Sequence, residues 1–487
     1  SALLLYNQRN YDDGDQVPYR TQGFAGRAAY TYADRYIAEF NFGYNGSENF
    51  AKGNRFGFFP SIAAGWIVSE EEFMRPVQNY INKLKLRASY GLAGNDRFYN
   101  DDGSQKRFAY ITTIGSTDGY KWGNSNAFYE KGGLREGDPG VESLTWETVK
   151  KANVGIELGL FKMAELQVDF FHERREDIFM QRKNIPSSAG FPSAPWANYG
   201  IVTNKGFDIS LDLNKQINKD WFISARASVT YAKNKIIEQD EDLGVLGTYR
   251  SSTGKPVGQI FGLVNDGLYT EADFEDVTTG KLKPGLPVPK FSDRVYPGDI
   301  KYLDLNGDNE ITETDKTAIG GTVNPELVYG FGINLSYKNI DFGAFFQGNG
   351  RTYRIIGENQ KNFLPGSTIG AEGNIFTNAS DAWTVDNPSQ DVFYPRLHMG
   401  YNANNAQVSD WWLKDMSMLR LKNVELGYSF SKNLIKKAAM EYARIFVRGT
   451  NLLQFSKFDL WDPELNTSNG LKYPIMATYS IGLQVRF

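Results

Sequence analysis

The 487-residue sequence contains no cysteine and has only two histidines, His172 and His398. The absence of thiols excludes a disulfide framework, a cysteine nucleophile and a thiolate metal site. Neither histidine stands in a local motif with a serine or an aspartate that would mark a catalytic pair, so we expect no enzymatic activity. A phosphate-binding loop is also missing, because Gly254-Lys255-Pro256 lacks the glycine-rich approach and the following helix.

The sequence also lacks long apolar runs, and its mean hydropathy is −0.46. Because a transmembrane helix needs about 18 or more consecutive apolar residues, membrane-spanning helices are excluded. The net charge of −4 at pH 7 argues against a nucleic-acid partner. What the chain has in abundance is glycine (49), tyrosine (28) and phenylalanine (33), a composition typical of β-rich proteins with aromatic girdles.

The last part of the chain shows the clearest pattern. From Ile475 to Phe487 every second residue is apolar, and the residues between them, after Met476, are polar or small. Such a strand gives roughly 43 Å of extended chain and about 33 Å of height at a tilt near 40°, which fits a bilayer. The ending on an aromatic residue resembles the assembly signal of outer-membrane β-barrels, and the residues that carry it are Ser480, Gly482, Val485 and Phe487.

The same alternation recurs along the chain and predicts about fourteen antiparallel strands. Polar residues such as Glu39, Lys85, Glu157 and Arg226 occupy the face opposite the apolar one, which indicates a water-filled or plugged lumen. We therefore predict an all-β fold, a transmembrane antiparallel β-barrel; a large soluble β-protein is the alternative interpretation. The expected strands lie near residues 1–9, 20–33, 35–47, 56–69, 82–95, 148–160, 163–178, 198–214, 221–236, 326–337, 339–349, 417–430, 442–455 and 474–487.

The connections between these strands alternate in length. Tight ones are expected at 33–35, 162, 216–219 and 338, with moderate ones at 70–81 and 431–441. Outer-membrane barrels have short periplasmic turns and long extracellular loops, so the long connections are predicted to lie outside the cell. These predicted extracellular loops span about 96–147, 179–197, 237–325, 350–416 and 456–473.

Most of the tryptophans fall in the predicted exterior loops. Aromatic faces stack on sugar rings or on peptide side chains, and loops in a rigid scaffold commonly carry function. The competing interpretation is that large ordered loops need small apolar cores of their own. On the first interpretation, we predict substrate contacts for Trp122, Trp383, Trp411 and Trp412.

One exterior loop carries the spacing of a calcium-binding loop. Oxygen-bearing residues stand at positions 1, 3, 5, 7, 9 and 12 of a turn rich in aspartate, where a hard cation takes six to eight oxygen ligands. Asn309 replaces the usual glycine at position 6, and an aspartate replaces the usual glutamate at position 12. Asparagine tolerates the left-handed conformation, so we predict a Ca²⁺ site, with an ion-free turn as the alternative. Its ligands are Asp304, Asn306, Asp308, Glu310, Thr312 and Asp315.

Several longer blocks resemble a known family, the SusC/RagA group of TonB-dependent transporters from Bacteroidetes. They extend over essentially the whole chain, which makes the resemblance more specific than any single motif. The blocks lie at residues 55–66, 69–73, 84–91, 94–96, 204–208, 254–262, 297–302, 304–308, 420–428, 451–453 and 458–464.

The resemblance implies a 22-stranded outer-membrane barrel that holds an N-terminal plug and imports glycans or peptides. It also implies TonB as the energy source and a SusD-like surface lipoprotein as a lid. This chain shows neither a plug nor a TonB box, and about eight strands fewer, so residues 1–487 are expected to be the C-terminal part of a longer transporter. The expected partners are therefore the plug and remaining strands, TonB, the SusD-like lid, outer-membrane lipid, and an oligosaccharide or peptide substrate.

Two other interpretations stay open at this point. A complete fourteen-stranded barrel would be a passive outer-membrane channel. A barrel whose loops only hold a ligand would be a surface glycan-binding module, and binding without energised uptake would distinguish it.

Overall fold

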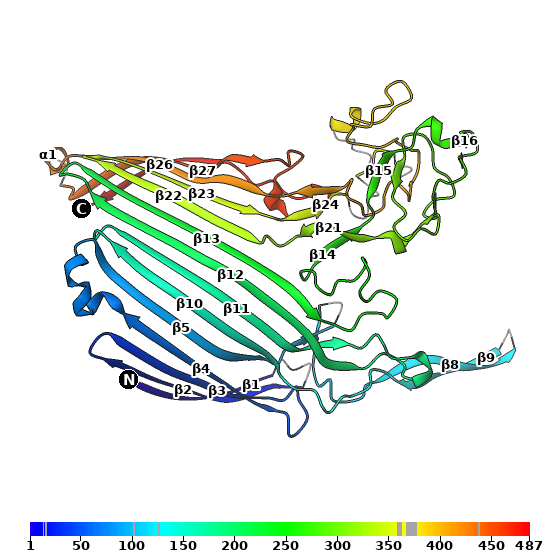
Figure 1. Cartoon of the computed structure of the whole chain (residues 1–487), viewed down its shortest axis with the longest axis horizontal. Helices are drawn as coiled ribbons and strands as arrows, with labels where there is room; N and C mark the ends of the chain where they lie inside the picture. Colours follow the sequence, from blue (N-terminus) through cyan, green and yellow to red (C-terminus); the bar gives the residue numbers. More distant parts are fainter. Residues whose placement is uncertain are drawn as a thin grey trace. The chain divides into compact units, whose positions relative to one another are not determined.

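The computed structural model describes residues 1–487 apart from 13, 15–16, 101–102, 125–126, 358–362, 367–376 and 437–438, and it is almost entirely β (Figure 1). Within the described residues, no helix has the length and apolar character needed to cross a membrane. The long strands follow one another in chain order in a 14-stranded antiparallel sheet. They are β1 (Ala2–Tyr11), β2 (Tyr19–Tyr32), β3 (Tyr36–Ser47), β4 (Phe56–Ile67), β5 (Ile81–Asn95), β10 (Glu147–Leu160), β11 (Ala164–Gln181), β12 (Trp196–Gln216), β13 (Trp221–Glu238), β22 (Leu327–Tyr337), β23 (Ile340–Gly350), β26 (Met418–Ser429), β27 (Tyr442–Ser456) and β28 (Thr478–Arg486).

These strands confirm the predicted fold class, since each predicted strand overlaps one long strand of the sheet. The chain divides into two compact units, which we describe separately. The first comprises Ser1–Leu213, Ala232–Leu246 and Thr253–Lys255, and the second comprises Asn214–Tyr231, Gly247–Ser252 and Pro256–Phe487.

In the first unit, the strand register places like residues side by side. Leu86 on β5 pairs with Ile156 on β10, which pairs with Val168 on β11. In the neighbouring row, Lys85 pairs with Glu157, which pairs with Gln167. Because a one-residue slip would exchange the two faces, the alternation in the sequence specifies this register.

The second unit repeats the arrangement. Leu426 on β26 pairs with Val447 on β27, which pairs with Ile481 on β28, and all three side chains are exposed. The adjacent row joins Glu425 to Arg448. Rows of exposed apolar side chains of this extent belong against lipid.

The last strand is shorter than predicted. The sequence pattern indicated thirteen residues from Ile475, whereas β28 covers nine, Thr478–Arg486. Its pairing with β27 ends at Thr450 opposite Thr478. The next β27 residue, Asn451, has a φ of 56°, and its side chain donates to Met476 O at 3.3 Å in place of a backbone ladder. Nine residues still give roughly 30 Å of strand and about 23 Å of height, close to the apolar band of a barrel wall.

The short turns use left-handed residues, as tight hairpins require. Ala33 and Asp34 have φ values of 52° and 54°, and Phe161 and Lys162 have values of 54° and 56°. Because successive strands are antiparallel, the short connections of each unit fall at one end of its strands and the long ones at the other (Figure 1). This confirms the predicted alternation of short and long connections.

The long connections contain their own structure, which the periodicity did not predict. They hold small two-stranded sheets and three apolar clusters. The strands are β6 (Phe98–Tyr99), β7 (Gln105–Lys106), β8 (Ile114–Asn124), β9 (Ala127–Glu136), β14 (Gln259–Gly262), β15 (Asn265–Leu268), β16 (Phe274–Asp276), β17 (Lys281–Leu282), β18 (Val288–Pro289), β19 (Ile300–Tyr302), β20 (Glu310–Ile311), β21 (Thr317–Thr322), β24 (Tyr353–Ile355) and β25 (Leu413–Asp415), and a short helix α1 (Lys432–Ile435) lies in a turn.

Candidate functional site

The polar face of the first unit carries a network of ion pairs. Glu157 on β10 lies 3.0 Å from Lys83 Nζ, 3.2 Å from Lys85 Nζ and 3.5 Å from Arg87 Nε. Asp169 on β11 binds the same Arg87. The two carboxylates are largely shielded from solvent and the cations around them are partly exposed, so this face of the sheet is a charged, ion-paired wall. This is the polar lining that the alternation predicted.

The second unit builds the same kind of wall with arginines. Arg444 on β27 donates to Glu425 at 2.6 Å and to Asp341 on β23 at 3.0 Å, and Arg448 donates to Glu425 at 2.6 Å. Arg444 reaches Asp341 across Gly427, where a Cβ would lie 2.3 Å from its guanidinium. The Arg444–Asp341 pair therefore requires that residue 427, on the intervening strand, has no side chain.

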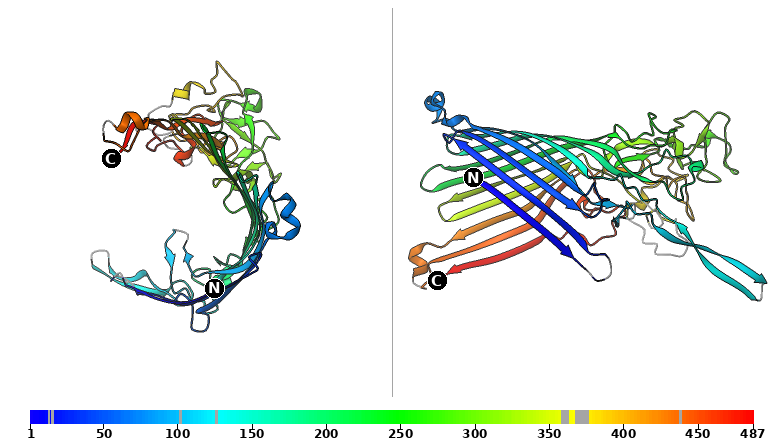
Figure 2. Two further views of the ribbon diagram at one scale, coloured as in Figure 1. Left: turned by 90° about the vertical axis from the view of Figure 1, so that its left-hand side faces the viewer. Right: turned by 90° about the horizontal axis from the view of Figure 1, so that it is seen from below.

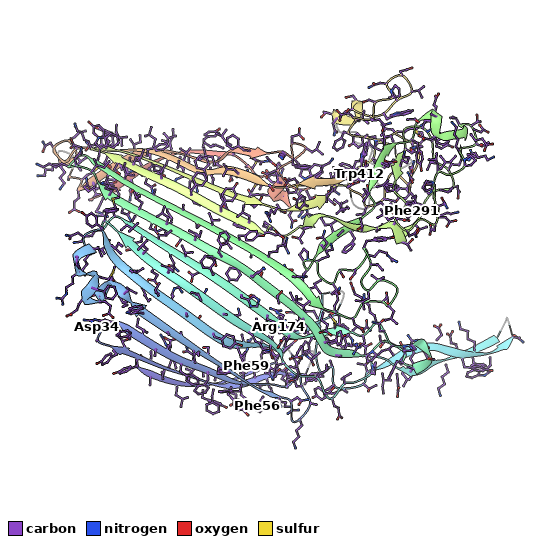
Figure 3. All side chains as sticks on the ribbon, in the orientation of Figure 1. Asp34, Phe56, Phe59, Arg174, Phe291 and Trp412 are labelled. Atoms are coloured by element: carbon purple, nitrogen blue, oxygen red, sulfur yellow. The ribbon has the colours of Figure 1, made fainter. Side chains whose placement is uncertain are left out.

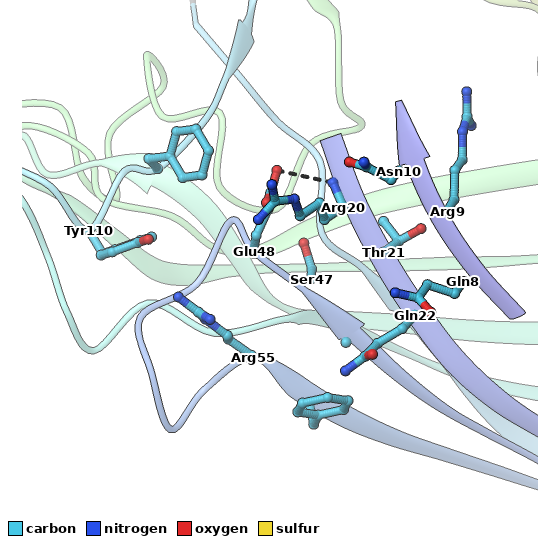
Figure 4. Close-up of a pocket in the computed structure, with 13 residues that line it drawn as sticks. Gln8, Arg9, Asn10, Arg20, Thr21, Gln22, Ser47, Glu48, Arg55 and Tyr110 are labelled. Atoms are coloured by element: carbon cyan, nitrogen blue, oxygen red, sulfur yellow. Dashed lines mark hydrogen bonds between the residues drawn. The ribbon is translucent and has the colours of Figure 1, made fainter. Parts of the chain in front are cut away.

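A cavity of about 550 Å³ lies at the long-loop ends of β1 to β4 (Figure 4). Its wall is polar, and Glu48 accepts a 3.1 Å bond from the backbone N–H of Arg20. Guanidinium, amide and aromatic groups together suit a polar or anionic group of an oligomer. The lining residues are Gln8, Arg9, Asn10, Arg20, Thr21, Gln22, Gly46, Ser47, Glu48, Arg55, Phe56, Phe108 and Tyr110.

Arg107 fastens the loop beside this cavity to the strand ends. Its guanidinium donates to the carbonyl oxygens of Val17 and Pro18 and to Glu48 Oε1 at 2.8 Å. It also lies 3.6 Å from the ring centre of Tyr19. Because one guanidinium makes all of these contacts, Arg107 holds its loop beside the cavity.

A second fastening lies where two connections of the first unit meet. Asp240 accepts bonds from Arg182 Nε at 2.8 Å, from Lys183 N at 2.7 Å and from Asn184. Burial alone would raise the pKa of Asp240, but these donors lower it to about 2. The carboxylate therefore stays ionised at neutral pH and ties the two segments together.

The tryptophans predicted to touch substrate fall into two groups. Trp412 is fully buried and donates from Nε1 to Asn405 O at 2.8 Å, Trp383 is buried, and Trp411 packs against the same apolar cluster (Figure 3). In that cluster, burial raises the pKa of Tyr394 to about 12. Trp383 and Trp412 belong to the core of an exterior loop assembly and Trp411 packs against it, as the competing interpretation predicts. Contact of these three side chains with substrate stays a prediction.

Trp122 differs, because 46% of it is exposed on the hairpin formed by β8 and β9. Its ring stacks with Tyr120 at 5.8 Å and with Tyr129 at 6.2 Å, with interplanar angles of 27° and 22°. The three rings lie nearly parallel and are all exposed, so they form an aromatic surface that suits stacking on a planar or ring-shaped ligand. The sequence periodicity did not predict the hairpin, and only the presence of Trp122 in a long loop indicated a candidate site there.

The predicted calcium loop has the expected backbone. Asn309 at position 6 takes the left-handed φ of 65°. Asp304 accepts from Gly307 N and Asn309 N, and the buried Asp315 accepts from Leu305 N at 3.0 Å and Thr312 N at 2.8 Å. Within the described part of the chain, no three carboxylate or histidine groups are gathered closely enough to hold a metal ion. The Ca²⁺ site therefore stays a prediction.

A sheet with one exposed apolar face and one ion-paired polar face defines the wall of a membrane β-barrel. No family model matches the chain. Curated relatives do: it is 30% identical to TonB-dependent receptor P26 of Formosa agariphila, covering 98% of this chain and 47% of that protein. It is 25% identical to TonB-dependent receptor SusC of Bacteroides thetaiotaomicron, covering 99% and 46%. The chain thus spans about half the length of the relatives it matches.

Solved structures agree on the fold. The RagAB peptide transporter matches with a TM-score of 0.71 at 22% identity, over 96% of this chain and 47% of that one. The RagAB peptide importer in its open-open state matches with a TM-score of 0.70 at 24% identity, over 97% and 47%. These comparisons confirm the predicted resemblance to the SusC/RagA group of TonB-dependent receptors and, with it, the outer-membrane location.

Proposed function

We propose that this chain is the C-terminal part of an outer-membrane importer that takes up oligomeric nutrients, glycans or peptides. The observation that carries the proposal is the pairing of a polar, ion-paired strand face with long structured exterior loops, on a chain similar to TonB-dependent receptors. A lumen lined in this way admits polar oligomers, and the exterior loops select them.

The energy for uptake would come from TonB, acting through a plug domain and further strands of the same transporter. The relatives are named as TonB-dependent receptors, and they are about twice as long as this chain, which leaves room for these parts. In the proposed arrangement, the chain supplies wall and loops and no enzymatic activity.

A SusD-like surface lipoprotein would act as the lid over the exterior loops. The similarity of this chain to SusC and to the RagAB peptide importer supports a partner of this kind. The loop core around Trp412 would give such a lid a firm surface, because a loop with its own buried cluster keeps its shape without the partner.

A surface glycan-binding module is the second candidate, favoured by the exposed aromatic surface of Tyr120, Trp122 and Tyr129. In the importer, the same surface would capture the oligomer before it enters. The two functions differ in their dependence on energy, because a binding module holds its ligand with or without TonB whereas an importer needs TonB for uptake.

The test is uptake of labelled oligosaccharides and peptides by cells that carry the full-length transporter, with and without a functional TonB. The importer predicts internal label that disappears without TonB while surface binding stays. Surface binding with no internal label in either strain would support the module instead.

A further inference from the structure

The connection between β4 and β5 is longer than a hairpin needs. Residues 68–80 contain two short 3-10 helices, η1 (Val68–Glu70) and η2 (Glu72–Val77), whereas the tight turns at 33–35, 161–163, 217–220 and 338–339 have two to four residues. Val68 and Met74 are buried, but Phe73 is 64% exposed and Tyr80 is 60% exposed. Large apolar side chains left exposed together need a partner.

Glu71 fixes the direction in which this segment leaves the sheet. Its carboxylate accepts from Tyr36 Oη at 2.7 Å, Trp66 Nε1 at 3.0 Å and Arg35 Nη1 at 3.1 Å. Tyr36 and Trp66 pair across β3 and β4 and stack at 6.4 Å, on the face that also carries the exposed Phe40. The segment therefore folds toward the lipid-facing side, and Figure 2 shows it projecting from the convex side of the first unit's sheet.

The segment continues the aromatic belt of the barrel at the short-turn end, which is the periplasmic end. Tyr80 meets Phe161 of the next short turn edge-on at 5.9 Å, and Phe161 is exposed as well. Tyrosine and tryptophan concentrate where the acyl region meets the headgroups.

The charges of the segment fit the same depth. Three donors surround the Glu71 carboxylate and Arg35 balances its charge, which removes most of the penalty of leaving bulk water. Glu72 and Arg75 form an exposed pair at 3.5 Å, and such a pair complements the opposite charges of a zwitterionic headgroup. Exposed apolar and exposed charged groups together suit the interface and not the acyl centre.

We propose that residues 68–80 form an interfacial foot that rests among phospholipid headgroups of the periplasmic leaflet, with Phe73, Val77 and Tyr80 against the lipid. The foot fixes the depth and tilt of the wall on its periplasmic side, where anchors of this type act. It is a lipid-binding surface distinct from the import pathway, so its failure would leave the proposed function standing.

The test uses the full-length transporter in bilayers, with an environment-sensitive fluorophore on a single introduced cysteine. This chain has no cysteine of its own, so Phe73→Cys gives a unique label once any cysteine elsewhere in the protein is replaced. Quenchers are placed on lipids either at the headgroup or at the acyl-chain centre. Tyr80→Cys is the second probe, in case the first variant does not fold.

The foot predicts loss of most of the Phe73→Cys fluorescence with the headgroup quencher and little loss with the chain-centre quencher. Phe40→Cys on the wall should respond mainly to the chain-centre quencher, and Tyr120→Cys on the exterior hairpin to neither. If neither lipid quencher reaches the probes at 73 and 80, because a periplasmic protein covers them or because they lie in water, the proposal is overturned. So does quenching mainly from the chain centre.

Discussion

Arg87 on β5 binds Asp169 on β11, with Nη2 and Oδ2 2.6 Å apart, although β10 lies between the two strands. The side chain crosses at Gly155, which pairs with both residues in the register. A Cβ at Gly155 would lie 2.5 Å from Asp169 Oδ1 and 2.8 Å from Arg87 Nε. The ion pair therefore depends on the missing side chain of a third residue.

Replacing Gly155 with alanine should destabilise the wall. The added methyl group has to displace the ion pair, and overpacking of this kind costs about 1–3 kcal/mol. The expected result is a lower unfolding midpoint of the full-length barrel in lipid vesicles. Gly65→Ala is the matched control, because its Cβ would meet only ordinary contacts from 3.5 Å outward. Equal unfolding midpoints for the two variants would show that the Arg87–Asp169 pair across Gly155 does not contribute to stability.

Replacing Trp412 with alanine should loosen the exterior loop assembly. Removing a fully buried tryptophan costs about 3–5 kcal/mol, and here it also removes the bond to Asn405 O. We expect faster cleavage of the long loops by added protease on intact cells. Trp122→Ala, on the exposed hairpin, should leave that cleavage rate unchanged. An equal increase in cleavage rate for Trp122→Ala would contradict the assignment of Trp412, and not Trp122, to the core of the loops.

Trp122→Ala should instead weaken ligand capture. Loss of one ring from the stacked surface removes about 0.5–1.5 kcal/mol of aromatic interaction, or roughly a twofold to twelvefold change in affinity. Binding of labelled oligosaccharide to cells without TonB measures it. Tyr473→Ala removes another exposed aromatic residue and serves as control. If both variants bind as the parent does, the hairpin is not part of the capture surface.

Acid should release the fastening at Asp240. Its pKa is lowered to about 2 by the donors Arg182, Lys183 and Asn184, against 3.8 for an ordinary aspartate. A lowered folded-state value means stabilisation that is complete above about pH 4 and lost as the pH falls toward 2. Pepsin cleavage near residues 182–184 should rise across that window. Asp240→Asn should show high cleavage already at pH 5; a flat profile for both proteins would refute the assignment.

Terbium luminescence tests the proposed Ca²⁺ loop. Tyr249 donates to Thr314 O at 2.7 Å, so its ring is close enough to sensitise an ion bound by residues 304–315. We expect a terbium signal that calcium displaces and that Asp304→Asn abolishes. Glu313→Gln lies in the same loop outside the ligand positions and should keep the signal. Absence of any signal in the parent would favour the ion-free turn.

The wall could be predicted from the sequence because a strand with lipid on one side and water on the other must alternate. Rows such as Leu86–Ile156–Val168 follow directly from that rule. The start of β28 could not be predicted, because residues 475–477 keep the alternation of a strand but lie outside its ladder with β27. Beyond Thr450 the left-handed Asn451 donates from its side chain to Met476 O instead.

The exterior loops follow no such rule. Trp412 and Trp122 look alike in sequence, yet one is buried against residues more than a hundred positions away and the other lies exposed on a local hairpin. Likewise, nothing before the structure showed that Glu71 binds Tyr36 and Trp66 and turns residues 68–80 outward. Such contacts depend on which distant segments meet, and a local pattern does not encode that.

The most direct test of the central claim is a structure of the native complex purified from the outer membrane, with its chains identified by mass spectrometry. The importer predicts that β1 pairs with a further strand of the same polypeptide, that a plug occupies the lumen, and that a lipoprotein covers the exterior loops. A barrel closed by direct pairing of residues 2–11 with residues 478–486, with no plug and no lid, would contradict the claim and leave a passive channel.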